Sequence, residues 1–370
     1  MKFSIHQQVL NDVLITVNKA VSPRVTSPIL AGVYIEALEN EVIFRTTNLE
    51  LSVSATVPAL IEEDGSALLP AKLLSDIVST FPQEAVSIEA TQDNAEILCT
   101  KSNFNIRVLN ALDFPEFPSV DTNQKVTLPY SDFSKMTKKV ANMVARDDAR
   151  PILQGVDVNV NNDSLELVAT DGYRVAVAKS KIQTDNRSEF SAVIPGAFLM
   201  EIAGLKGDIQ NATISLSENQ VVVECNDYVF INRRIAGNFP NFKQVLPDSS
   251  TISAKLNSKA LSEAVKRIGV LGGMAPVVRI EMDPANNLIT LTGDAQDVGS
   301  CEESLDVQYS SDSDQNKDDI LFNCNYIIDG LNCLNCKEVI LDFVAKDKPA
   351  IFKSADDDES IYMLSPVKPK

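Results

Sequence analysis

The stretch Thr170-Asp171-Gly172-Tyr173-Arg174-Val175-Ala176 lies near the middle of the chain and carries its clearest local folding signal. The alternating residues 165–169 before it and the apolar residues 175–178 after it are typical of strands. The Asp-Gly pair favours a tight hairpin, because glycine takes a positive φ without steric cost and aspartate tolerates one. The tyrosine and arginine then leave the turn side by side, either as decoration of a strand end or as half of a recognition pocket.

The sequence around this turn recurs elsewhere in the chain. The run PILAGV at residues 28–33 matches PILQGV at residues 151–156, and PVVRI at residues 276–280 is a more distant third copy. The copies begin 123 and 125 residues apart, which is about one third of the chain. Thr47 lies 19 residues after Pro28, and Thr170 lies 19 residues after Pro151. The turn that begins at Thr47 is therefore equivalent to the one that begins at Thr170. Self-similarity at a fixed period indicates a repeated structural unit.

The second half of each unit repeats as closely as the first. Leu69-Pro70 and Ile194-Pro195 each precede a helical pattern, and Phe114-Pro115 and Phe239-Pro240 follow those prolines after 45 residues. In the third unit Phe322-Asn323 precedes the helix. Each unit therefore predicts an α+β domain with two helices against antiparallel sheet. We expect three tandem domains, residues 1–123, 124–248 and 249–370, with boundaries in polar, turn-rich stretches.

Composition narrows the class of protein. At 370 residues with 44% apolar content, the chain predicts two or three domains with packed cores. It has no apolar run of the ~18 residues that a membrane helix needs and no secretory signal at its start. Six cysteines without such a signal favour reduced thiols in the cytoplasm. The net charge of −18 argues against indiscriminate binding to nucleic acid or anionic lipid.

Positive charge is nevertheless concentrated on predicted helices. On the helix expected over residues 131–146, Lys135, Lys138 and Lys139 share one face, and Arg146 ends the segment. The equivalent helix of the third unit carries Lys259, Lys266 and Arg267, and Lys72 lies on the second helix of the first unit. One such stripe alone would be a solvated helix face. Its recurrence on equivalent helices favours a shared basic surface that touches a duplex weakly and in a salt-dependent manner.

Sequence signals for catalysis are missing. The single histidine, His6, is best explained by a structural role, and Gly272-Gly273 lacks the Lys-Ser/Thr of a phosphate-binding loop. Cys333 and Cys336 form a lone CxxC pair near Cys324, which leaves a zinc site as the lesser alternative to free thiols. We therefore expect no active site, no metal and no cofactor.

Taken together, these segments resemble the bacterial β sliding clamps, the processivity subunits of DNA polymerase III. The resemblance runs from Met1 to Lys370 and rests on five segments: Arg24 with residues 28–30, Phe114-Pro115, residues 170–174, residues 237–240 and residues 366–368. It implies a non-catalytic protein of three clamp domains. Two copies would form a closed ring, joined head to tail, around duplex DNA.

The resemblance also implies partners and a pocket for them. In this family the groove between the second and third domains binds linear motifs of the DNA polymerase III catalytic subunit, the clamp loader, other polymerases and repair proteins. Gln244 and Ser365 depart from the family pattern and predict altered motif preference. The corresponding pocket residues here are Leu153, Thr170, Gly172, Tyr173, Arg174, Val175, Pro240, Val245, Pro366 and Val367.

Two further residue sets follow from the resemblance. The ring joint would bring Lys101 and Phe104 of one copy against Val270, Leu271, Glu302 and Glu303 of the other. Asp147 and Asp148 depart from a purely basic lining of the hole. The DNA-facing candidates are Arg24, Lys72, Lys135, Lys138, Lys139, Arg146, Arg150, Lys259, Lys266 and Arg267.

Two alternatives belong to other classes of protein. An interaction scaffold that has lost its DNA role would use the peptide pocket alone. A carboxylate-dependent hydrolase would show turnover that a single Asp or Glu substitution abolishes.

Overall fold

The structure is a computed structural model that describes residues 1–22, 28–111, 114–122, 124–147, 149–182, 189–247, 249–273, 276–295, 299–310, 317–356 and 359–368. Contacts divide the chain into two compact units. The first comprises Met1–Phe133 and Glu201–Arg234, and the second comprises Ser134–Met200 and Ile235–Lys370.

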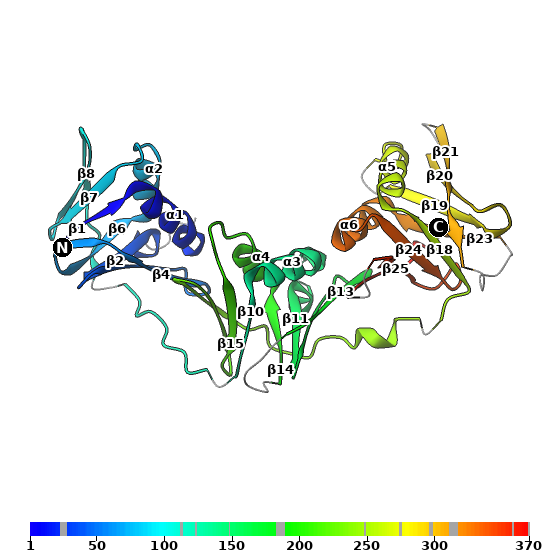
Figure 1. Ribbon diagram of the computed structural model, residues 1–370, viewed down its shortest axis with the longest axis horizontal. Coiled ribbons are helices and arrows are strands. Elements are labelled where there is room, and N and C mark those ends of the chain that lie inside the picture. Colours follow the sequence, from blue (N-terminus) through cyan, green and yellow to red (C-terminus); the bar gives the residue numbers. More distant parts are fainter. Residues whose placement is uncertain are drawn as a thin grey trace. The chain divides into compact units, whose positions relative to one another are not determined.

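The first unit combines two antiparallel sheets with two helices, α1 (Gln7–Val17) and α2 (Ala71–Ser79) (Figure 1). The sheets have the orders β5-β1-β7-β8-β9 and β10-β15-β16-β17-β4-β3-β2-β6. Their strands are β1 (Lys2–His6), β2 (Gly32–Leu38), β3 (Glu41–Thr47), β4 (Ser52–Pro58), β5 (Leu60–Glu63), β6 (Gly65–Pro70), β7 (Ala85–Ala90), β8 (Asn94–Cys99), β9 (Ser102–Arg107), β10 (Gln124–Pro129), β15 (Asn211–Leu216), β16 (Gln220–Cys225) and β17 (Tyr228–Arg233).

The second unit repeats this design with α5 (Ser258–Gly269) and α6 (Cys324–Leu334), which pack on each other. Helices α3 (Tyr130–Val140) and α4 (Gly196–Ala203) contribute to both units. The sheets have the orders β14-β11-β12-β13-β26-β25-β24-β18-β22 and β21-β20-β19-β23. Their strands are β11 (Gly155–Asn161), β12 (Ser164–Thr170), β13 (Arg174–Lys181), β14 (Phe190–Pro195), β18 (Ile252–Asn257), β19 (Val277–Asp283), β20 (Leu288–Ala295), β21 (Gly299–Asp306), β22 (Gln308–Tyr309), β23 (Asp318–Asn323), β24 (Glu338–Phe343), β25 (Ala350–Ser354) and β26 (Ser360–Leu364).

Neighbouring repeats are joined by antiparallel strand pairing. Strand β4 of the first repeat pairs with β17 of the second, and β13 of the second repeat pairs with β26 of the third. The second repeat thus shares one continuous sheet with each neighbour. This sharing explains why contacts group the chain into two units. The division into three domains at residues 123 and 248 stays a prediction.

The hairpin predicted around residue 171 is confirmed. Strands β12 and β13 pair in register on either side of the turn, with Thr170 opposite Val175. The helix predicted over residues 131–146 is too long, because α3 ends at Val140 and is followed by a short 3-10 turn, Ala141–Met143. The chain leaves the helix there because the Ala145 N–H donates to the Leu153 carbonyl instead (2.8 Å). Arg146 therefore lies in a loop.

Helix α6 shows how tightly the core of the second unit is packed. Tyr362 of β26 is fully buried, and its hydroxyl donates to the Tyr326 carbonyl of α6 at 2.7 Å. Gly330 lies over this ring, and a Cβ at Gly330 would approach the ring to 2.4 Å. Only glycine allows the helix to approach the sheet this closely.

Substituting Gly330 by alanine should therefore destabilise the protein. Overpacking costs about 1–3 kcal/mol, and the better helix propensity of alanine offsets up to about 1 kcal/mol of that. Chemical denaturation should show a lower free energy of unfolding. Asn332→Ala, at an exposed position of the same helix, is the control and should raise it slightly. A Gly330→Ala variant as stable as the wild type would contradict the close packing.

Candidate functional site

The turn between β12 and β13 is held by its own side chains. The carboxylate of Asp171 accepts the N–H groups of Tyr173 (2.9 Å) and Arg174 (3.1 Å), and the Thr170 hydroxyl accepts the Gly172 N–H (3.0 Å). Gly172 has φ +92°, the left-handed conformation that glycine adopts most readily. The turn is thereby held by hydrogen bonds among its own residues.

The first repeat builds the same turn with different residues. The Asn48 side chain accepts the N–H groups of Glu50 (3.0 Å) and Leu51 (2.8 Å), and the Thr47 hydroxyl accepts the Leu49 N–H (3.1 Å). Leu49 occupies the position of the glycine and has φ +76°. A leucine in this region carries steric strain of about 1–2 kcal/mol.

Replacing Leu49 by glycine should relieve this strain. Because the leucine side chain is 59% exposed, little packing is lost, and we expect the free energy of unfolding to rise by up to about 1 kcal/mol. Gly172→Ala is the opposite change and should destabilise, because a residue with a Cβ rarely adopts the φ of +92° found here. Denaturation curves of both variants test the equivalence of the turns. If Leu49→Gly lost as much stability as Gly172→Ala, the equivalence of the two turns would be contradicted.

An apolar cavity of about 420 Å³ opens beside the turn. The walls come from the 3-10 turn Pro151–Gln154, from the turn itself, from residues 240–245, and from the end of β26. The cavity is lined by Arg150, Ile152, Leu153, Thr170, Gly172, Val175, Pro240, Asn241, Phe242, Val245, Pro349, Met363 and Ser365. Such a hollow, apolar with a few polar groups at its rim, is typical of a site for side-chain anchors of a ligand.

Six of the ten predicted pocket residues line this cavity: Leu153, Thr170, Gly172, Val175, Pro240 and Val245. Tyr173, Arg174, Pro366 and Val367 are not among its lining residues. Tyr173 is 61% exposed and lies beside the Tyr326 ring. Pro366 and Val367 are half-buried, and the Val367 N–H donates to the Leu321 carbonyl (2.8 Å).

Arg174 is a buried link within the second unit. Its guanidinium bonds to the carboxylates of Asp171 (2.9 Å) and Asp329 (2.6 Å), and it stacks on the Tyr326 ring at 4.3 Å. Asp171 belongs to the turn, whereas Asp329 and Tyr326 belong to α6. Arg174 thus fixes the turn to the helix of the next repeat, and a buried, paired arginine of this kind is costly to remove.

Several lining residues escaped the sequence analysis. Phe242 could have been found from the sequence, because its segment Phe239–Phe242 (FPNF) repeats Phe114–Phe117 (FPEF). In the structure Phe242 packs with Val168, Val175, Val177 and Met363 on the face of the sheet. Pro349 had no signal, since only the tertiary fold brings its loop to the cavity.

The predicted DNA-facing side chains differ in exposure and in their bonds within the protein. Lys72, Lys135, Lys138, Arg146, Lys259 and Lys266 are exposed, whereas Arg24 lies outside the described residues. Lys139 is half-buried and donates to the Ser360 hydroxyl (2.7 Å), and Arg267 forms a bidentate pair with Glu303 (2.7 and 2.5 Å). Arg150 lines the cavity and donates to the Asp171 carbonyl (2.9 Å).

Four of the six predicted ring-joint residues lie on an edge strand or directly precede one, and the other two follow a helix. Phe104 (39% exposed) lies on β9 and Lys101 directly precedes this strand, which ends the first sheet of the first unit. Glu302 and Glu303 lie on β21, which ends the four-stranded sheet of the second unit. Val270 is 81% exposed and, with the half-buried Leu271, follows α5.

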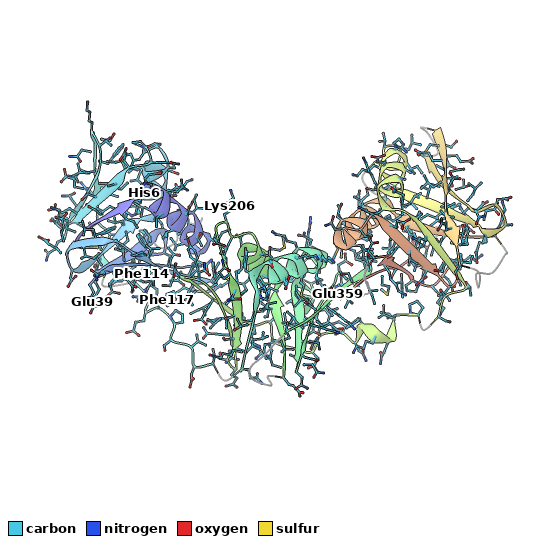
Figure 2. The ribbon with its side chains drawn as sticks, viewed as in Figure 1. His6, Glu39, Phe114, Phe117, Lys206 and Glu359 are labelled. Atoms are coloured by element: carbon cyan, nitrogen blue, oxygen red, sulfur yellow. The ribbon has the colours of Figure 1, made fainter. Side chains whose placement is uncertain are left out.

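The cysteines and the histidine have structural positions. All six cysteines are free, and burial raises the pKa of Cys324 to about 11 and that of Cys333 to about 12, which keeps both thiols protonated. In the described part of the chain, no group of three or more His, Cys, Asp or Glu residues could hold a metal ion. The Nδ1 atom of His6 accepts the Gln8 N–H and caps α1 (Figure 2). None of the described helices is long and apolar enough to cross a membrane.

Helix pairs on antiparallel sheets, joined repeat to repeat by strand pairing, define the class of DNA-clamp folds. Models of the N-terminal, central and C-terminal domains of the DNA polymerase III beta subunit match residues 1–118, 127–241 and 243–368. The chain belongs to this family, and the predicted resemblance is confirmed.

Individual relatives agree along the whole chain. The chain is 28% identical to the beta sliding clamp of Bacillus subtilis over all of both chains, and 28% identical to that of Synechococcus elongatus over 100% of this chain and 99% of the relative. The crystal structure of the Bacillus subtilis clamp superposes with a TM-score of 0.93 at 28% identity and full coverage of both chains. A putative beta subunit from Eubacterium rectale superposes with a TM-score of 0.90 at 25% identity, again over both full chains.

Membership of this family makes the protein a DNA sliding clamp, a non-catalytic processivity factor of DNA replication. The predicted α+β fold of tandem clamp domains is confirmed with it. The hydrolase alternative is set aside on the same ground.

Proposed function

We propose that two copies of this chain close head to tail into a ring that holds duplex DNA by enclosure, and that the cavity beside Gly172 binds linear motifs of partner proteins. The pattern of strand pairing between repeats is the observation that carries this proposal.

The two internal joints use equivalent strands. Strands β4 and β13 are each the third strand of their repeat's β-meander, following β2-β3 and β11-β12. Their partners β17 and β26 are each the last strand of the repeat that follows. The rule is that the third strand of one repeat pairs with the last strand of the next.

Among the described residues, one strand of each kind has no such partner. Strand β21 is the third strand of the third repeat's meander, and β9 is the last strand of the first repeat; both are sheet edges. An exposed edge offers unpaired N–H and C=O groups to another chain. The same rule applied between two copies joins β21 of one to β9 of the other. This is a heterologous contact, and it yields a ring where the rotation closes.

Charge and exposure suit this joint. Lys101 and Arg107 flank the β9 edge, whereas Glu302, Glu303 and Asp306 lie on β21. Opposite charges on facing strands favour the pairing and help to fix its register. The exposed Phe104 and Val270 would supply apolar contact.

Enclosure reconciles DNA binding with the net charge of −18. A ring needs only weak contacts to phosphates, and exposed lysines on helices supply them. Lys72, Lys135, Lys138, Lys259 and Lys266 are the side chains that we assign to this role, together with Arg146 from its loop. A cytoplasmic site of action follows from the presence of DNA there.

The apolar cavity supports the second part of the proposal. Its apolar walls fit the leucine or phenylalanine anchors of an extended segment, and Arg150 and Asn241 at the rim can bond to its polar atoms. The partners that we assign are the DNA polymerase III catalytic subunit, the clamp loader, other polymerases and repair proteins. Gln244 and Ser365 near the cavity would tune their motif preference.

Retention on circular and linear DNA tests enclosure directly. A ring loaded on a closed circle has no free end to leave by, so its half-life there should exceed that on linear DNA of equal length at least tenfold. Cutting the circle should release it. Mass measurement in solution should give twice the chain's 40.3 kDa. Equal loss from both DNAs would contradict the proposal.

Reversing Lys135, Lys138 and Lys139 to glutamate separates the tether from a scaffold that has lost its DNA role. Loading on DNA should fall at least tenfold because the phosphate contacts become repulsive, whereas peptide binding to the cavity should persist. Reversal of Lys181, Lys337 and Lys346, which are exposed on other segments of the same unit and do not line the cavity, is the matched control for loading. Unchanged loading of the helix variant would favour the scaffold.

A further inference from the structure

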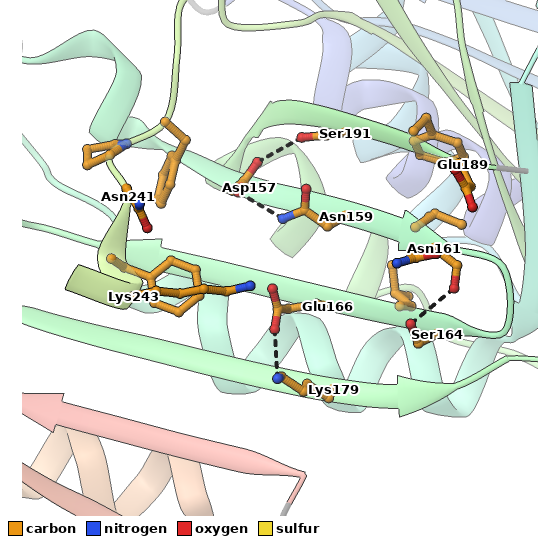
Figure 3. Close-up of a pocket in the computed structure, with 16 residues that line it drawn as sticks. Asp157, Asn159, Asn161, Ser164, Glu166, Lys179, Glu189, Ser191, Asn241 and Lys243 are labelled. Carbon is orange, nitrogen blue, oxygen red and sulfur yellow. Dashed lines mark hydrogen bonds and ion pairs between the residues drawn. The ribbon is translucent and has the colours of Figure 1, made fainter. Parts of the chain in front are cut away.

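A second hollow adjoins the apolar cavity on the outer face of the sheet. It has a volume of about 860 Å³ and shares Pro240, Asn241 and Phe242 with the cavity, so this segment forms a wall common to both. The other walls come from β11, β12, β13 and the start of β14 (Figure 3). We call this hollow the polar groove. Its lining is made chiefly of polar and charged side chains.

Asp157 is a buried carboxylate of the polar groove. Valines 156 and 158 of β11 point into the core, so Asp157 points to the opposite face, where it is only 9% exposed. Its carboxylate accepts the Asn159 amide (2.8 Å) and the Ser191 hydroxyl (3.4 Å) (Figure 3). Both partners are neutral, and no lysine or arginine of the described residues forms an ion pair with Asp157.

The two lysines that line the groove lie beside a different carboxylate, that of Glu166. Lys179 pairs with Glu166 at 3.0 Å, and Lys243 points toward Glu166 from the shared wall (Figure 3). Glu189 lies at the far end, where it accepts the Asn162 amide (2.7 Å). Burial raises the pKa of Asp157, and the charge of Glu166 raises it further. A buried charge is ordinarily paired, and none of the described residues forms an ion pair with this carboxylate.

The first repeat fills the same place in a different way. Tyr34 lies 123 residues before Asp157, and its ring stacks on that of Phe114 at 5.5 Å. Phe114 begins the FPEF segment that corresponds to the shared wall. Aromatic packing thus replaces the carboxylate, so packing against the sheet does not require an acid at this position.

We propose that the polar groove extends the peptide site, and that Asp157 binds the cationic group of an arginine or lysine that flanks the apolar anchors of a partner segment. This inference rests on the proposed binding of motifs in the cavity. Continuity through Pro240–Phe242 gives the segment a path. A buried carboxylate that no lysine or arginine of the described residues pairs with favours a cation as its ligand.

Peptide titrations of the full-length protein test the inference. The probes are a labelled peptide with leucine and phenylalanine anchors, the same peptide with arginine added through a short spacer at either end, and versions with neutral citrulline in place of arginine. One arginine extension should tighten Kd about tenfold, as expected for a hydrogen bond between charged groups, whereas its citrulline version should not.

Two variants test whether Asp157 is responsible for the tighter binding of the arginine peptide. The ratio of Kd values, anchor peptide to arginine peptide, should fall to about one in Asp157→Asn. It should stay near the wild-type value in Asp163→Asn, which removes the same charge from the exposed β11–β12 turn. Ratios within twofold of one for both extensions in the wild type, or an equal fall in both variants, would overturn the inference.

The same titrations distinguish failure of this inference from failure of the proposed motif binding in the cavity. In that case the anchor peptide itself would not bind, and Val175→Asp in the cavity would change nothing. A measurement of thermal stability checks that the Asp157→Asn variant is folded. Because the folded-state pKa of Asp157 is raised, ionising it disfavours folding as pH rises, so the variant should melt above the wild type at neutral pH and lose this advantage below about pH 4.

Discussion

Antiparallel pairing between the third meander strand of one repeat and the last strand of the next is the interaction on which this structure depends. It appears twice, as β4 with β17 and as β13 with β26, and each time it merges the sheets of two repeats. Because backbone hydrogen bonds carry the joint, the side chains around it can vary widely. The equivalent turns of the first two repeats show this freedom, since asparagine and leucine replace aspartate and glycine with the same bonding pattern.

The same pairing organises the proposed sites. At the joint of β13 and β26, the turn at Gly172, the wall segment 240–245 and the end of β26 converge on one apolar cavity. Arg174 locks this region by bonding to Asp171 on one side and Asp329 of α6 on the other. The apolar cavity and the neighbouring polar groove share Pro240, Asn241 and Phe242 as a common wall.

Much of this architecture could be predicted from the sequence, because repeats and turns are local signals. The PILxGV runs, the Asp-Gly hairpin and the FP segments predicted the repeated units and the hairpin. The six predicted residues that line the cavity came from the family resemblance instead. Prediction failed where contacts between distant segments determine where a helix ends or where a loop lies. Helix α3 ends at Val140 because the Ala145 N–H finds the Leu153 carbonyl, and Pro349 reaches the cavity only through the fold. The ion pair of Arg174 with Asp329 is a further example, because these residues lie far apart in the sequence and no local pattern links them.

Hydrogen–deuterium exchange of the full-length protein, at concentrations above and below its dimerisation constant, tests the central claim most directly. If equivalent strands join between copies as they do within one, amides of β9 and β21 should exchange at least tenfold more slowly in the dimer. Edge strands outside this joint, such as β14 and β22, should show no change. A stable dimer in which β9 and β21 exchange as freely as in the monomer would contradict the account.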